Sequence, residues 1–184
     1  METSKKVLTI PNLLSLFRLF LAGLFAWVYY REGLAEGRPW LLAILVVSAV
    51  TDMLDGRIAR RFHMISDLGK ILDPIADKVT QGVLILCLLS EYRLMRPVLI
   101  LFIMKELYMA IAGARALIKT RRNEGAKWYG KMSTAVIYVV MILLFLIPGL
   151  PLPVANLLIG ISGLCMLLSL SMYILFYHNL EKKG

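Results

Sequence analysis

Six long apolar stretches alternate with short polar segments along the chain. They cover residues 12–30, 40–62, 68–91, 97–120, 131–147 and 154–177. Each is close to the roughly 20 residues that a helix needs to cross a hydrocarbon core about 30 Å thick. Almost nothing remains for a soluble domain. The pattern predicts an all-α, polytopic membrane protein in which residues 1–184 form a single transmembrane domain of six helices.

Composition and charge support a membrane location. The chain is 59% hydrophobic, above the roughly half-apolar balance of a soluble domain. Its formal net charge of +9 could suggest binding to nucleic acid. The position of the charges argues against this, because most lysines and arginines face one side when the amino terminus is placed in the cytoplasm. This positive-inside pattern predicts that both termini are cytoplasmic and that the partner is the lipid bilayer, with no nucleic acid bound.

Four aspartates interrupt the second and third apolar stretches: Asp52, Asp55, Asp73 and Asp77. An ionised aspartate at bilayer depth costs about 2.5–3.5 kcal/mol on insertion scales, so four of them require compensating cations. Helical spacing places each pair on one face of its helix. The short connection makes the two helices antiparallel neighbours, so Asp55 should face Asp73, and Asp52 should face Asp77. The two facing pairs then lie about 10 and 15 Å from the connection.

Carboxylate oxygens are the ligands that Mg²⁺ or Mn²⁺ prefers. Four such groups can hold two ions about 3.5–4 Å apart, an arrangement that stabilises both the attacking and the leaving oxygen in phosphoryl transfer. Gly56, Ala59 and Gly69 share the acidic face and leave room for a phosphorylated ligand, although glycines in membrane helices also serve close packing. Arg60 offers a fork of donors to phosphate, or anchors the helix end at the membrane surface. The sequence therefore predicts a site for two divalent cations.

The segment from Asp52 to Asp77 resembles the signature of the CDP-alcohol phosphotransferases. That signature is Asp-x2-Asp-Gly-x2-Ala-Arg-x8-Gly-x3-Asp-x3-Asp, and the chain matches every specified position. Pro11-Asn12-x-Leu14-Ser15-x-x-Arg18 is similar to the amino-terminal segment of the family. The resemblance implies the family's fold, transfer of a phosphatidyl group from CDP-diacylglycerol to an alcohol, and release of CMP. It also implies a homodimer in the bacterial cytoplasmic membrane, with a cavity open to the cytoplasm.

The resemblance assigns roles to individual residues. It implies that all four aspartates bind the two divalent ions and that Asp77 also takes the proton from the acceptor hydroxyl. The expected contacts to the CDP-alcohol are Ile10, Pro11, Asn12, Leu13, Gly56, Ala59, Arg60, Ser66 and Gly69.

Within the family, Lys105-Glu106 and residues 130–134 are most similar to the phosphatidylglycerophosphate synthases, whose acceptor is glycerol 3-phosphate. The candidate cations for the acceptor phosphate are Lys105, Arg115, Lys119 and Lys131. Those synthases usually carry arginine at the position of Lys105 and again at that of Gly113. A cardiolipin synthase of the same family, with phosphatidylglycerol as acceptor, therefore stays open as the alternative.

Two other classes of membrane protein are alternatives to a transferase, because they also contain acidic residues or glycines in their membrane helices. A transporter or proton relay would use the acids and basic residues as a charged pathway. A purely structural membrane subunit would explain the hydrophobicity and the glycines. Neither explains the spacing of Gly56, Ala59 and Arg60 relative to the aspartates, which favours the transferase.

Overall fold

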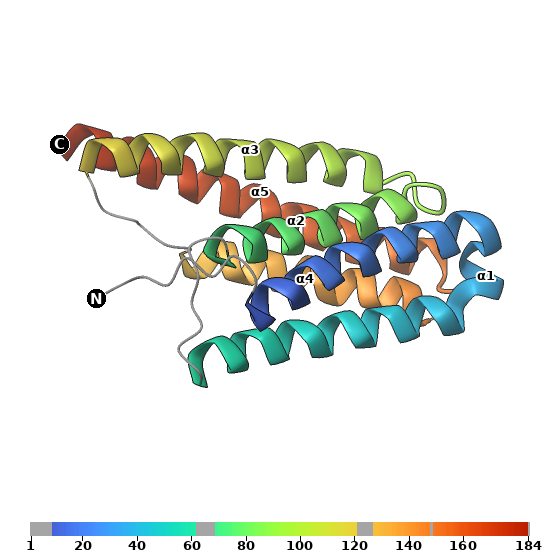
Figure 1. Ribbon diagram of the computed structural model, residues 1–184. Coiled ribbons are helices and arrows are strands. Elements are labelled where there is room, and N and C mark those ends of the chain that lie inside the picture. Colours follow the sequence, from blue (N-terminus) through green and yellow to red (C-terminus); the bar gives the residue numbers. More distant parts are fainter. Residues whose placement is uncertain (1–8, 62–68, 121–126, 148, 184) are drawn as a thin grey trace. The chain divides into compact units, whose positions relative to one another are not determined.

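Five helices make up the described part of the protein, which comprises residues 9–61, 69–120, 127–147 and 149–183 of the computed structural model; side chains at 55–61, 70, 119–120 and 181–183 are not described. No strand occurs in these ranges. The helices are α1 (Ile10–Arg61), α2 (Gly69–Leu88), α3 (Met95–Thr120), α4 (Trp128–Leu146) and α5 (Leu152–Lys183) (Figure 1). They form two compact units, Met1–Cys87 and Leu88–Gly184, which are described separately below.

Four stretches within these helices are long and apolar enough to cross a membrane: Ile10–Leu54, Met95–Ile118, Trp128–Leu146 and Leu152–Leu180. They confirm the prediction of an all-helical integral membrane protein for the described residues. The first stretch has 45 residues, more than twice the length of one crossing, and it contains most of the first two predicted spans. The third predicted span corresponds to α2, which is not among the four. Six crossings therefore remain a prediction.

A single glycine divides α1 into two arms. Gly33 has φ 76° and ψ 176°, a backbone conformation that glycine reaches without steric cost. Figure 1 shows that α1 reverses its direction at a bend. Residues 10–32, the first arm, therefore lie alongside residues 34–61, the second arm. The bend thus converts one continuous stretch of helix into an antiparallel pair.

Helix α2 packs against the first arm and runs in the same direction. Ser15 contacts Asp73 and Arg18 contacts Asp77, at sequence separations of 58 and 59 residues. Because both residue numbers rise together at a nearly constant separation, the two helices are parallel. The second arm is therefore antiparallel to α2, as expected for the predicted hairpin.

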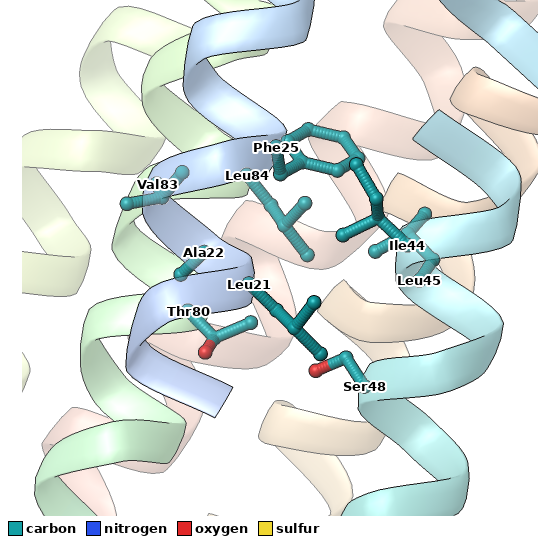
Figure 2. Close-up of a pocket in the computed structure, with 9 residues that line it drawn as sticks. All are labelled: Leu21, Ala22, Phe25, Ile44, Leu45, Ser48, Thr80, Val83 and Leu84. Atoms are coloured by element: carbon teal, nitrogen blue, oxygen red, sulfur yellow. The ribbon is translucent and has the colours of Figure 1, made fainter. Parts of the chain in front are cut away.

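The interior between the two arms and α2 is apolar, with two hydroxyl groups at one end. A small pocket of about 10 Å³ lies there, and its lining residues are drawn in Figure 2. Its lining consists of Leu21, Ala22, Phe25, Ile44, Leu45, Ser48, Thr80, Val83 and Leu84. A space of this size has room for about one water molecule. The three segments are thus packed closely, which fixes the positions of Arg18, Asp52 and Asp77, each about one turn away from the pocket on its own helix.

In the second unit, α5 packs against both α3 and α4. Tyr173 of α5 is 1% exposed, and its ring lies 4.6 Å, centroid to centroid, from that of Tyr129. Its hydroxyl accepts a hydrogen bond of 3.1 Å from the backbone N–H of Lys127, just before α4 begins. A Cβ added to Gly130 would lie 2.9 Å from two carbons of the Tyr173 ring and closer still to its hydroxyl oxygen. The side chain of Tyr173 therefore occupies the space that a side chain at residue 130 would need.

Candidate active site

Three of the four predicted metal ligands converge on one arginine of the first arm. The Nη1 atom of Arg18 lies 2.5 Å from Oδ1 of Asp52 and also contacts Oδ1 of Asp77. Its Nη2 atom lies 3.9 Å from Oδ1 of Asp73. The side chain of the fourth predicted ligand, Asp55, lies outside the described residues. The structure therefore brings Asp52, Asp73 and Asp77 to a common centre, and the predicted facing of Asp52 and Asp77 agrees with their shared contact.

The cluster is buried on the side of the arginine and open on the side of the acids. The Arg18 side chain is 4% exposed, whereas those of Asp52, Asp73 and Asp77 are 56%, 43% and 51% exposed. A buried guanidinium requires anionic partners, and an arginine inside an apolar helix of a membrane protein requires them even more. The three carboxylates meet this requirement and still present oxygen atoms to an incoming ligand.

Ser15, one turn before Arg18, contacts the cluster from the same arm. Its Oγ atom lies 3.0 Å from the carbonyl oxygen of Pro11 and within hydrogen-bonding contact of Oδ1 of Asp73. A hydroxyl has one hydrogen to donate, so these two acceptors share it. Ser15 is completely buried. It therefore orients the carboxylate of Asp73 from the buried side of the cluster.

Sequence reasoning did not assign Ser15 and Arg18 to the site. Both belong to the amino-terminal segment that resembles the family, and Arg18 interrupts the first apolar stretch. An arginine within such a stretch is itself a signal, because it requires a carboxylate from another helix. The sequence thus indicates that Arg18 pairs with a carboxylate, but it does not identify which carboxylate that is.

The residues predicted to contact the CDP-alcohol are only partly described. Pro11 and Asn12 are buried at the start of α1, Ile10 and Leu13 are exposed, and Gly69 is buried at the start of α2. Gly56, Ala59 and Arg60 belong to the last turns of α1, but their side-chain surroundings are not described, and Ser66 lies outside the described residues. The nucleotide contacts therefore stay predictions.

The donor set fits a divalent cation. Among the described residues no group of three acidic, histidine or cysteine side chains has the geometry of a metal site as it stands. Asp52, Asp73 and Asp77 nevertheless offer only carboxylate oxygens, the hard ligands that suit Mg²⁺ or Mn²⁺. Two of these oxygens already contact a single positive nitrogen, that of Arg18. The same carboxylates would hold the metal ion.

The predicted acceptor residues that are described lie in the second unit. Lys105 of α3 is 2% exposed, and its Nζ atom lies 2.9 Å from Oε1 of Glu106. Arg115 of α3 and Lys131 of α4 are exposed, and the side chain of Lys119 is not described. The charge of Lys105 is therefore balanced within α3, whereas Arg115 and Lys131 are accessible.

The sequence model of the CDP-alcohol phosphatidyltransferase family matches residues 8–175. The chain belongs to this family. The family is membrane-bound and uses divalent metal ions generally, so the carboxylate cluster of this member lies in a setting where a metal is expected.

Two relatives of this family member carry different activities in their names. The chain is 31% identical over 129 residues to the CDP-diacylglycerol--glycerol-3-phosphate 3-phosphatidyltransferase of Escherichia coli K12, a match covering 68% of this chain and 70% of that protein. It is 47% identical over 76 residues to the cardiolipin synthase (CMP-forming) of Streptomyces coelicolor. That match covers 40% of this chain and only 35% of the length of the synthase.

Proposed function

We propose that this protein transfers a phosphatidyl group from CDP-diacylglycerol to an alcohol and releases CMP. The observation that carries the proposal is the convergence of Asp52, Asp73 and Asp77 on one cationic group. These are three of the aspartates in the signature of a family whose model matches residues 8–175. Half-exposed carboxylates that can hold divalent cations suit a reaction in which a negatively charged pyrophosphate must be bound and cleaved.

The proposed chemistry uses the described residues as follows. Asp52, Asp73 and Asp77, together with Asp55, would hold two divalent cations. When bound, these ions would polarise the phosphoryl oxygens and neutralise the charge that develops on them. Asp77, whose side chain is 51% exposed, accepts the proton of the acceptor hydroxyl as general base. The acceptor oxygen forms a bond to the β-phosphorus, the bond to the CMP oxygen breaks, and CMP leaves. Ser15 orients Asp73 during this step.

We infer the nucleotide contacts, the six spans, the homodimer and the orientation in the membrane from membership of the family. Residues 10–13, Gly56, Ala59, Arg60, Ser66 and Gly69 would contact the CDP-alcohol. The chain would form one catalytic domain that crosses the bilayer six times and pairs with a second copy as a homodimer. Both termini and the site would face the cytoplasm of a bacterial cell. The basic residues near the expected cytoplasmic ends of the helices support this orientation.

Glycerol 3-phosphate is the proposed acceptor. The Escherichia coli relative, whose name includes glycerol 3-phosphate, is matched over 68% of this chain and 70% of its own length. The accessible cations Arg115 and Lys131 could bind the acceptor phosphate, together with Lys119, which follows Arg115 in α3. Lys105 would contribute only if it exchanged Glu106 for the acceptor.

Phosphatidylglycerol is the second candidate acceptor, and two observations favour it. The relative named cardiolipin synthase is 47% identical over its matched segment. The pairing of Lys105 with Glu106 also leaves less free positive charge for a phosphate monoester. A lipid phosphodiester carries one negative charge and requires fewer cations.

The test is an acceptor panel with purified protein. CDP-diacylglycerol and Mn²⁺ are supplied with glycerol 3-phosphate, phosphatidylglycerol, serine or inositol phosphate in separate reactions, and CMP is measured. CMP release with glycerol 3-phosphate is expected. Release only with phosphatidylglycerol would make the protein a cardiolipin synthase. No release with any acceptor, together with ion flux in liposomes, would replace the proposal with a transporter.

A further inference from the structure

One buried arginine occupies the centre of the candidate metal site. The Nη1 atom of Arg18 contacts Oδ1 of Asp52 and Oδ1 of Asp77 at the same time, and Nη2 is directed toward Asp73. A divalent cation held by Asp52 and Asp77 would need carboxylate oxygens that Nη1 now contacts, since Mg²⁺ and Mn²⁺ bind through such oxygens. Arginine and metal therefore compete for the same oxygens.

We propose that Arg18 is the resident counter-ion of the metal-free site and releases Asp52 and Asp77 when a divalent cation binds. This inference rests on the proposed metal-dependent function. The difference in exposure between Arg18 and the three carboxylates indicates the side from which the cation would enter. Arg18 approaches from the protein interior, with 4% of its side chain exposed, and the carboxylates remain open on the opposite side. An ion can reach the acids from that open side while the guanidinium stays attached to its helix.

Charge explains why the chain benefits from such a residue. Without a cation, three carboxylates on neighbouring helices would repel one another, and the guanidinium offsets one of these charges where they converge. With a divalent ion bound, the same guanidinium faces a second positive charge across a few ångströms. Arg18 therefore stabilises the metal-free protein and weakens metal binding.

A purely structural role for Arg18 predicts the opposite sign. If the guanidinium only pins the two arms of α1 and α2 together, its removal lets Asp52 and Asp77 move apart, and metal binding weakens. The sign of the change in metal affinity thus separates the two roles.

The experiment measures Mn²⁺ binding by electron paramagnetic resonance in detergent, with no substrate present. Arg18→Gln is compared with the wild type and with Arg31→Gln. Arg31 is an exposed arginine of the same arm, which lies over the ring of Trp27, and its replacement removes the same charge away from the acids. We expect Arg18→Gln to bind Mn²⁺ at least about fivefold more tightly, the lower end of typical coupling between two ligands. Arg31→Gln should bind like the wild type.

Thermal unfolding supplies a second readout. In chelator, Arg18→Gln should unfold at a lower temperature than the wild type, and saturating Mn²⁺ should raise its midpoint by more than it raises that of the wild type. If this variant folds only with metal, it can be purified in Mn²⁺ and then chelated. Arg18→Lys, which keeps the charge without the fork, should have an affinity between the two.

The outcomes distinguish this inference from the proposed function. Unchanged or weaker Mn²⁺ binding by Arg18→Gln, or an affinity of Arg18→Lys at or below that of the wild type, overturns the counter-ion role and leaves the transferase intact. A wild-type protein that binds no Mn²⁺ overturns both the metal site and this inference.

Discussion

Replacing Gly130 by alanine tests how tightly α4 and α5 pack. The new Cβ would lie 2.9 Å from two ring carbons of Tyr173 and closer to its hydroxyl oxygen, whereas carbon atoms in contact rest about 3.5–4.0 Å apart. Overpacking of this kind costs about 1–3 kcal/mol. Displacing Tyr173 would also weaken its hydrogen bond from Lys127, about 1 kcal/mol, while alanine regains about 0.5–1 kcal/mol of helix propensity. The expected net loss of stability is about 2 kcal/mol.

Gly160 offers a matched control within the same unit. A Cβ at Gly160 meets no atom within 4 Å, so Gly160→Ala should stabilise α5 by about 0.5–1 kcal/mol. Unfolding of both variants in detergent can be followed by circular dichroism. In a Tyr173→Phe background the nearest clashing atom is gone, so Gly130→Ala should cost less than in the wild type. A Gly130→Ala protein as stable as the wild type would refute the packing argument, because Tyr173 would then move aside freely.

The remaining predictions concern the carboxylates and the buried lysine. Asp77→Asn should keep the fold but lower CMP release at least about 100-fold, since it removes the general base, and near-normal turnover would contradict that role. Excess chelator should abolish CMP release, and added Mn²⁺ should restore it; full activity in chelator would falsify the metal requirement. Ser15→Ala should weaken Mn²⁺ binding about tenfold or more, because Asp73 loses the group that orients it, and titration calorimetry can measure this. Lys105→Met should destabilise the protein by up to about 3 kcal/mol, because the partly buried ion pair between Lys105 and Glu106 is broken. Adding Glu106→Gln should recover most of that loss, and equal stability of the single and double variants would argue against the pair.

The helical architecture and the acidic centre could be predicted from the sequence because both depend on local spacing. Hydrophobic stretches give helices, and i, i+4 spacing places Asp73 and Asp77 on one face. The shared contact of Asp52 and Asp77 with Arg18 agrees with the register counted from the hairpin. These features involve neighbouring segments, for which the connection limits the possible arrangements.

The roles of Ser15 and Arg18 could not be predicted in the same way. Their contacts join residues 58 and 59 positions apart, and they exist because the first arm of α1 lies beside α2. Hydrophobic periodicity shows that a helix needs neighbours but does not identify them. The burial of Lys105 against Glu106 was equally hidden, because adjacent residues on a helix do not normally face each other.

The bend at Gly33 limits where residues can be inserted into or deleted from the two arms of α1. Arg18 and Asp52 meet only because each lies a set number of residues from the bend. One extra residue between Gly33 and Asp52 would rotate the carboxylate by about 100° and shift it by about 1.5 Å. Seven extra residues would nearly restore the angle but displace Asp52 by about 10 Å along the helix. Insertions and deletions should therefore be excluded from residues 18–52, a constraint on chain length rather than on residue type.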